Sequence, residues 1–115
     1  MNNDSDSQAV LIVVSDFTPT TTVCETIDAA LAFAIFDIDI DVYFTKNGVS
    51  QLDLNAPAFN EGKILAKQWR SAEIYGVRSL LVDAASTAPN QNLIDEAVIT
   101  NHMPDSSNYK HVLHL

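Results

Sequence analysis

The sequence is short of cysteine, basic residues and long apolar runs, and each shortage excludes a class of protein. The single cysteine, Cys24, cannot form an internal disulfide and suits a reducing compartment. Six basic residues stand against fifteen acidic ones, and the net charge of −9 argues against direct binding to nucleic acid or to an anionic membrane. No apolar run reaches the ~18 residues of a membrane span, and the polar start is unlike a secretory signal. We therefore expect a cytoplasmic protein.

The length of 115 residues indicates one domain. Residues Met1–Gln8 have nothing apolar to bury, so we expect a disordered tail there and a single domain over residues 9–115. The glycine spacing of a dinucleotide-binding loop and the Walker sequence are both missing. We expect neither a cofactor nor a metal.

The most informative stretch runs from Ala9 to Phe36. Six consecutive apolar residues, Ala9–Val14, are too few for a globular helix and too continuous for a half-exposed strand, so they predict a strand buried on both faces. A polar loop, Ser15–Thr22, follows. Thr22 and Glu25 form a capping-box pattern in front of a helix predicted over Val23–Phe36.

A second strand is predicted over residues 38–44, where apolar and polar residues alternate, with one buried and one wetter face. Residues 46–48, Lys-Asn-Gly, predict a turn with a residue free to take positive φ. A short helical turn is expected within 49–55, and the remnant of a helix within 104–108.

The second half predicts one helix and further strands. The helix begins at Pro57 or Lys63, runs to Tyr75 and stops at Gly76. A third strand ends near Asp83, residues 93–100 suit either a short helix or a strand, and residues 110–115 predict a terminal strand. This order indicates a three-layer α/β/α fold of flavodoxin-like architecture, with a mostly parallel sheet of four to five strands.

Four short motifs occur in this order and resemble the DsrE/DsrF-like family over nearly the whole chain. They are Phe44-x-x-x-Gly48-Val49, Tyr75-Gly76-Val77, Asp83-Ala84-Ala85-Ser86 and Tyr109-x-x-Val112-Leu113. Within the family, the chain looks most like the TusC/DsrF subunits of sulfur-relay complexes of the TusBCD and DsrEFH types.

This resemblance implies a function in an oligomeric assembly. Such complexes pass a persulfide from a cysteine on a TusD/DsrE subunit, for 2-thiouridine formation in tRNA or for sulfur oxidation. TusD/DsrE-like and TusB/DsrH-like subunits are the implied partners. In sulfur-carrying relatives the reactive cysteine lies near the end of the third strand, where this chain has Asp83 and no cysteine. A noncatalytic, supporting subunit is therefore the expected role.

Two alternatives follow from the residues themselves. Asp16 and Asp83 are predicted at the carboxyl ends of two strands, where ligands bind in open α/β sheets. With the hydroxyls of Thr20, Thr21 and Thr22 they could hold a small ligand in a stand-alone homo-oligomer. The same two carboxylates could instead hold Mg²⁺, as in a receiver-like domain. The plain explanation is that these residues cap turns and the first helix.

Cys24 is the one thiol that could carry sulfur in this chain. As the second residue of a capped helix it would lie near free amide groups that favour a thiolate, although Glu25 opposes this. A lone cysteine in an apolar helix is more often a small buried residue. A Cys24→Ser variant tested for persulfide formation separates the two.

Other acidic residues, histidines and aromatics have simpler explanations. Asp37, Asp39 and Asp41 lie on one face of a strand without the loop of a calcium site, so they should face water or a partner. His111 and His114 point to opposite faces of a strand and cannot chelate one metal. Some helix aromatics exceed what one small core can hold and could form an interface; they are Phe33, Phe36, Trp69 and Tyr75.

Overall fold

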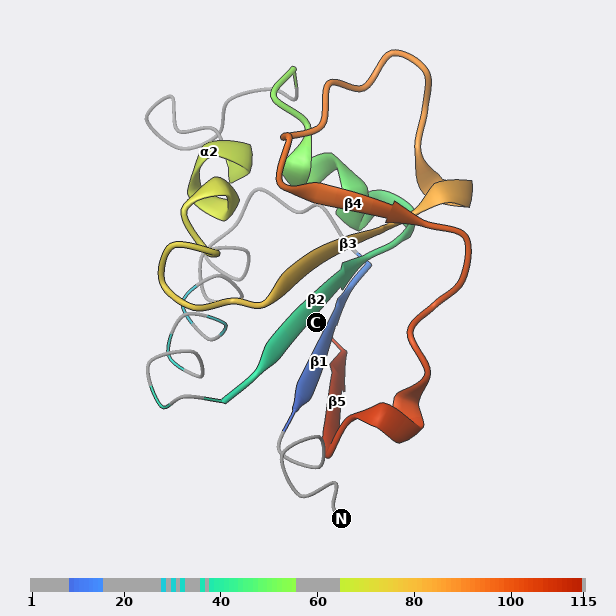
Figure 1. The fold of residues 1–115 in the computed structure, drawn as a ribbon. Coiled ribbons are helices and arrows are strands. Elements are labelled where there is room, and N and C mark those ends of the chain that lie inside the picture. The colour runs from blue at the N-terminus through green and yellow to red at the C-terminus, as the bar shows by residue number, and fades with distance from the viewer. Residues whose placement is uncertain are drawn as a thin grey trace.

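A five-stranded parallel sheet forms the centre of the molecule in the computed structural model, which describes residues 9–15, 28, 30, 32, 36, 38–55 and 65–114 (Figure 1). The strands are β1 (Val10–Val14), β2 (Ile40–Phe44), β3 (Ser79–Asp83), β4 (Ala97–Thr100) and β5 (His111–His114). Their order across the sheet is β4-β3-β2-β1-β5, and all four neighbouring pairs are parallel. The predicted α/β fold with a parallel sheet is confirmed.

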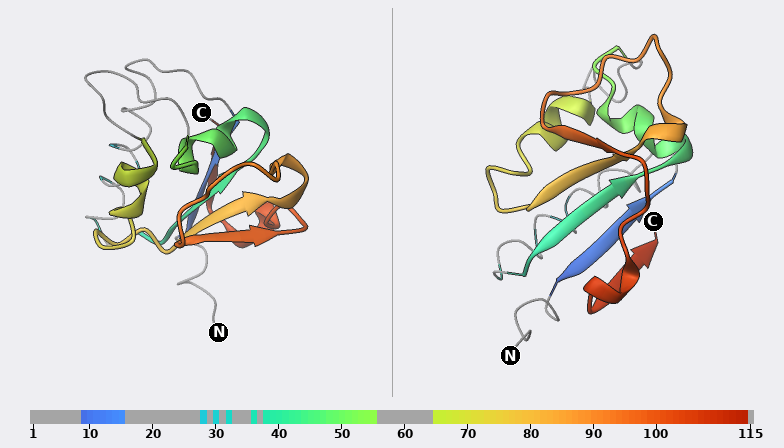
Figure 2. Two further views of the ribbon diagram at one scale, coloured as in Figure 1. Left: turned by 90° about the horizontal axis from the view of Figure 1, so that it is seen from above. Right: turned by 45° about the vertical axis from the view of Figure 1, so that its right-hand side comes forward.

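The first strand occupies the interior of the sheet, as its apolar run predicts. β1 pairs with β2 from Val10↔Ile40 to Val14↔Phe44 and with β5 on its other side. All five of its residues are buried. Figure 2 shows β4 and β5 at the two ends of the twisted array, so β1 has no free edge.

The larger core lies on one face of the sheet, beneath the helical segments. Trp69, on α2 (Leu65–Arg70), is fully buried, and its ring is nearly perpendicular to that of Phe44, with 5.0 Å between the ring centroids. The Trp69 indole N–H donates a 2.8 Å hydrogen bond to Gln51 Oε1 on the 3₁₀ helix η2 (Lys46–Leu52). Ala30, in the first predicted helix, belongs to the same cluster. Trp69 is thus a core residue rather than an interface residue.

On the opposite face of the sheet one prediction is wrong, because the second face of β2 is not exposed to solvent. Asp41 and Tyr43 are each only 5% exposed, although their alternation with apolar residues suggested a solvated face. Tyr43 joins Leu11 and Val13 in a second cluster, against which Tyr109 and other residues pack. Both faces of β2 are therefore covered.

The end of the second helix follows the predicted glycine stop. The turns after α2 close at Gly76, which has φ of 111°. The Gly76 N–H donates to the Glu73 carbonyl at 3.2 Å, and the Val77 N–H donates to the Ala72 carbonyl at 3.1 Å. This pair of bonds is a Schellman motif, which only a residue tolerant of positive φ closes without strain.

The turn after β2 differs from the prediction in which residue takes positive φ. Lys46 does so, with φ of 52°, whereas Gly48 serves close packing. A Cβ atom added to Gly48 would lie 2.1 Å from the Val14 carbonyl oxygen. Glycine is needed here because a backbone carbonyl occupies the space of a side chain.

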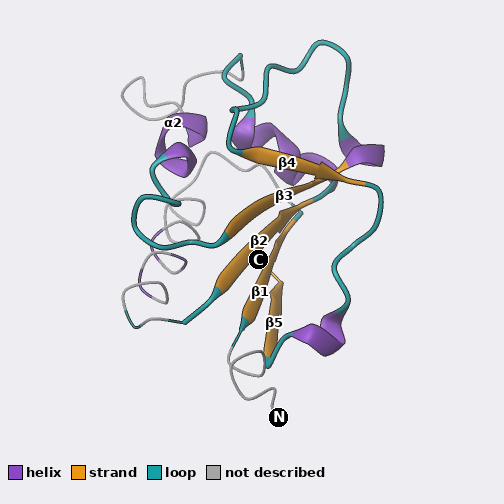
Figure 3. Ribbon diagram, in the orientation of Figure 1, coloured by secondary structure: helices purple, strands orange, loops and turns teal. Residues whose placement is uncertain are grey.

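The remaining elements complete the comparison (Figure 3). Residues 93–100, ambiguous in the sequence, contain β4, and the loop at 104–108 contains the 3₁₀ helix η4 (Ser106–Asn108). Within the predicted first helix, the described residues Asp28, Ala30 and Ala32 are helical. The predicted tail at 1–8, Phe33 and the start of the second helix lie outside the described residues. None of the described helices has the length and apolar character to cross a membrane.

Candidate functional site

The carboxyl ends of the strands hold one of the predicted site residues. Asp83 is the last residue of β3. The other candidates lie outside the described residues; they are Asp16, Thr20, Thr21, Thr22 and Cys24. The structure therefore places Asp83 at the expected edge, and the predicted grouping with the threonine loop stays a prediction.

Asp83 is the centre of a hydrogen-bonded group that we call the Asp83 cluster, made of Thr45, Lys46, Asp83 and Ser86. The hydroxyls of Thr45 and Ser86 both donate to Asp83 Oδ2 at 2.8 Å. The Ala85 N–H donates to the other carboxylate oxygen at 3.1 Å. The Lys46 N–H donates to the Ser86 hydroxyl oxygen at 2.8 Å. One carboxylate thus ties the loop after β2 to the loop after β3.

Local sequence explains why the cluster forms. Asp83 is the N-cap of the 3₁₀ helix η3 (Ala84–Ser86), and its side chain accepts a bond from the second residue of that helix. Thr45 directly follows β2 and donates its N–H to the Val14 carbonyl at 3.0 Å. Because the strands are parallel, these ends meet at one edge of the sheet. Three neighbouring strands, β1, β2 and β3, are thereby joined at that edge.

Hydrogen bonding keeps the Asp83 carboxylate charged. The bonds from Ser86 and Thr45 lower the pKa of Asp83 below its ordinary value. Burial raises the pKa of Tyr43, and the Asp83 charge adds to this effect. Asp83 is consequently an anionic hydrogen-bond acceptor at neutral pH. It has no means of forming a persulfide, which requires sulfur.

Sequence reasoning missed a second polar group, which we call the Asp41 network. Arg78, just before β3, donates from Nε to Asp41 Oδ1 at 3.0 Å and from Nη2 to Asp41 Oδ2 at 2.7 Å. The Tyr109 hydroxyl donates to Asp41 Oδ2 at 2.6 Å. Arg78 Nη1 also lies 3.4 Å from Asp39 Oδ2. Asp41 therefore faces protein partners instead of water.

The electrostatics of the network follow from its burial. Burial raises the pKa of Asp41, but the hydrogen bonds from Arg78 and Tyr109 outweigh this and leave its pKa below the ordinary value. Burial, together with the bond to the Asp41 carboxylate, raises the pKa of Tyr109 to about 12. The hydrogen bonds to Asp41 and its negative charge raise the pKa of Arg78 above its ordinary value. All three groups hold fixed charge states near neutral pH, which suits a structural function.

The network lies at the amino ends of the strands, whereas the Asp83 cluster lies at their carboxyl ends. Asp41 is near the start of β2, Arg78 precedes β3, and Tyr109 precedes β5. The bond from Tyr109 to Asp41 holds the segment that leads into β5 against the second face of the sheet. One signal was available in the sequence, namely that Arg78 is the sole charged residue of the run 77–82.

Metal-binding candidates give no assembled site in the part of the chain that is described. There, no three side chains of histidine, cysteine or acidic type gather closely enough to hold a metal ion. His111 and His114, at the two ends of β5, are exposed.

Comparisons with known proteins agree with this architecture. The model of the DsrE/DsrF-like family matches residues 8–102. A crystal structure of the YchN protein from E. coli superposes with a TM-score of 0.74, at 15% sequence identity, and the match covers 94% of this chain and 99% of that one. A comparison with curated protein sequences gives no match. At this identity the likeness to YchN concerns the fold alone.

Proposed function

Because the chain belongs to the DsrE/DsrF-like family, we propose that it is a noncatalytic, TusC/DsrF-like subunit that supports an intracellular sulfurtransferase assembly. Its partners would be TusD/DsrE-like and TusB/DsrH-like subunits, and the assembly would serve 2-thiouridine formation in tRNA or sulfur oxidation. The thiol that carries the persulfide would belong to the TusD/DsrE-like partner.

The observation that carries this proposal is the chemistry at the end of β3. Sulfur-carrying members of the family that the sequence resembles have a cysteine in this region, and here Asp83 takes its place. Its two carboxylate oxygens accept three hydrogen bonds from Thr45, Ser86 and Ala85. A carboxylate fixed in this way can organise the strand ends and accept hydrogen bonds from a partner, but it cannot accept sulfur.

Exposed apolar residues support a role in an assembly. Phe36, Ile74 and Tyr75 are 76%, 81% and 60% exposed. Phe36 precedes β2 and the other two precede β3, so these side chains belong to one edge of the sheet. Aromatic side chains such as Phe36 and Tyr75 are enriched at protein interfaces.

A sulfur-loading experiment tests the absence of chemistry in the isolated chain. The purified protein and its Cys24→Ser variant are treated with inorganic polysulfide, and the gain of a sulfur atom is followed by intact mass spectrometry after alkylation. We expect no difference between the two proteins. A persulfide on Cys24 that passes to an acceptor thiol would overturn the supporting role.

Co-purification tests the assembly itself. The tagged chain is co-expressed with the TusB-like and TusD-like chains of the same genome, together with a Tyr75→Glu variant and an Asn90→Glu control, in which the same charge is added at an exposed turn. We expect the wild type and the control to retain both partners and Tyr75→Glu to lose them. A self-sufficient homo-oligomer without these partners would instead favour the stand-alone ligand-binding alternative.

A further inference from the structure

The outer edge of β4 combines an open strand with exposed apolar side chains. β4 stands at one end of the sheet, and among the described residues no strand pairs with its outer side (Figure 2). Val98 and Ile99, which point to opposite faces as consecutive strand residues, are 54% and 59% exposed. The strand at the other end, β5, differs, because it exposes His111 and His114 while the two apolar residues between them are partly buried. The edge of β4 is therefore the apolar end of the sheet.

Backbone hydrogen bonds show which residues of β4 face the open edge. In β1 and β2, residues of the larger core turn their carbonyls towards the next strand: the Val14 carbonyl accepts from the residue after β2 at 3.0 Å, and the Ile40 carbonyl accepts from the residue before β3 at 2.8 Å. Ala97 packs against the same core, and Ile99 is two residues further on, so in this parallel sheet both turn their backbone groups away from β3. In agreement, the Ala97 N–H donates to the Ile94 carbonyl at 3.1 Å. Ile99 thus presents its N–H and C=O groups to the open edge.

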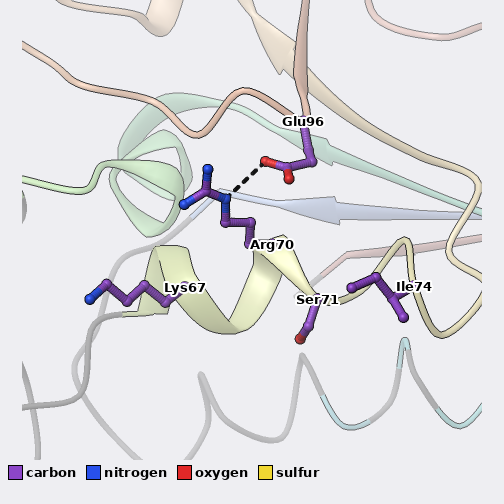
Figure 4. Close-up of a pocket in the computed structure, with 5 residues that line it drawn as sticks. All are labelled: Lys67, Arg70, Ser71, Ile74 and Glu96. Carbon is purple, nitrogen blue, oxygen red and sulfur yellow. Dashed lines mark ion pairs between the residues drawn. The ribbon is translucent and has the colours of Figure 1, made fainter.

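The sequence of β4 lacks the features that keep an edge strand from pairing with another chain. Such strands usually carry a lysine, a proline, an inward charge or a bulge. β4 has the sequence Ala-Val-Ile-Thr, and its four pairs with β3 are consecutive, without a bulge. Glu96, the acidic residue directly before β4, is engaged elsewhere: Arg70 Nε lies 3.4 Å from Glu96 Oε1, and Figure 4 shows the Arg70 side chain reaching from α2 towards it. The edge itself therefore carries no charge that repels an incoming strand.

We propose that this edge pairs with β4 of a second copy of the chain in an antiparallel arrangement, which joins two five-stranded sheets into one. A two-fold axis at Ile99 lets the Ile99 N–H of each copy donate to the Ile99 carbonyl of the other, and it sets Val98 of one copy opposite Thr100 of the other. The exposed apolar side chains of the two strands then cover one another. This pairing is independent of the proposed function in sulfur relay.

The charge distribution favours a second copy in this orientation. The chain has a net charge of −9, and the nearest carboxylates, Asp95 and Glu96, both precede β4. Antiparallel pairing places them at opposite ends of the joined strands, roughly 20 Å or more from those of the other copy at ~3.4 Å per residue. That separation exceeds the screening length of ~8 Å at physiological salt. Because stable dimers bury ~1,200 Å² or more and this edge has four residues, we expect a weak, concentration-dependent dimer.

Disulfide trapping tests the pairing and its register. Ile99→Cys and Val98→Cys are each made in a Cys24→Ser background, so each chain has one thiol, at positions of similar exposure. Across the proposed axis the two residues at position 99 have Cα atoms ~5.5 Å apart, which suits a disulfide, whereas the two at position 98 lie diagonally at ~7–8 Å. Under mild oxidation at high protein concentration, we expect Ile99→Cys to form the disulfide dimer about tenfold faster than Val98→Cys. Equal rates, or faster trapping at position 98, would overturn the proposal.

Sedimentation of the full chain over a range of concentrations tests the same surface without cysteines. Ile99→Lys places a charge on the edge and should leave the chain monomeric. Ile74→Lys makes the same replacement at a residue that is 81% exposed, away from β4, and should associate like the wild type. A wild type that stays monomeric, an Ile99→Lys variant that still dimerises, or equal loss in both variants would contradict the pairing. The fluorescence of the buried Trp69 reports whether each variant is folded. Retention of a TusD-like partner by Ile99→Lys is measured separately, so this proposal and the proposed function fail independently.

Discussion

The Asp41 network offers the sharpest test of how this fold is held together. Asp41 has a side chain only 7% exposed, and Arg78 supplies two of its three hydrogen bonds. Replacement of Arg78 by Met keeps the apolar stem of the side chain but removes its charge and its hydrogen-bond donors. The Asp41 carboxylate is then left buried, with Tyr109 as its remaining donor.

The magnitude can be bounded from these contacts. Removal of one partner of a fully buried ion pair costs about 3–5 kcal/mol. Arg78 is 45% exposed, so solvent screens part of its interaction, and Asp41 can also take up a proton. We therefore expect Arg78→Met to lower the free energy of unfolding by about 2–3 kcal/mol.

A second arginine, Arg70, serves as the control, and the single tryptophan, Trp69, serves as the probe of unfolding. Arg70→Met removes an arginine of the same exposure, 45%, whose partner Glu96 is 30% exposed, and should cost at most ~1 kcal/mol. Trp69 is the only tryptophan and is fully buried, so its fluorescence reports urea unfolding. The reasoning is refuted if the two arginine variants differ by less than ~0.5 kcal/mol, the usual spread of surface substitutions.

A double replacement distinguishes the cost of a stranded charge from the value of the pair. In Asp41→Leu/Arg78→Met no uncompensated carboxylate remains, and buried ion pairs can often be replaced by apolar residues with little loss. We expect this double variant to be more stable than Arg78→Met alone. The opposite order would mean that the pair itself, with Tyr109, provides most of the stability.

Three further predictions concern single groups. Gly48→Ala should lower the free energy of unfolding by about 1–3 kcal/mol, more than Gly76→Ala at about 1 kcal/mol, because a Cβ would meet a backbone carbonyl at 2.1 Å; urea unfolding measures both. Because the pKa of Tyr109 is raised to about 12, its contribution to stability is full below pH ~10 and is lost as the pH rises from there to about 12. In an ultraviolet titration, the phenol that ionises last should be absent from a Tyr109→Phe variant. Thr45→Val should raise the pKa of Asp83, seen by carbon-detected NMR titration, since one of the bonds that lowers that pKa is lost.

The sequence predicts those features of the fold that local pattern determines. The buried position of β1 follows from an uninterrupted apolar run, and the stop at Gly76 follows from a glycine after a helical stripe. The four residues of β4 are too few to distinguish a strand from a helix by period, so only the sheet resolves them. The family resemblance adds the overall architecture.

Features that depend on distant partners were missed. Arg78 and Tyr109 lie 37 and 68 residues from Asp41 along the chain, and no periodicity connects them. For the same reason the alternation of apolar and polar residues in β2 predicts a solvent-exposed face, whereas Asp41 and Tyr43 are buried. The position of Asp83 was predicted from the end of a strand, but its bond from Thr45, 38 residues away, was not.

The carboxylates of Asp41 and Asp83 therefore have different structural roles. Asp41 is buried, and its partners Arg78 and Tyr109 come from two distant segments, so a change there should act on stability before it acts on any binding partner. Asp83 is half-buried at the carboxyl edge, and its partners are two loop hydroxyls and one amide, so its loss should disturb the loops more than the core. Asp83→Asn keeps the acceptor geometry on one oxygen while it removes the charge. If this variant unfolds like wild type but fails to retain a TusD-like partner, the charge at the end of β3 acts at an interface; if the partner is retained, Asp83 only organises its own loops.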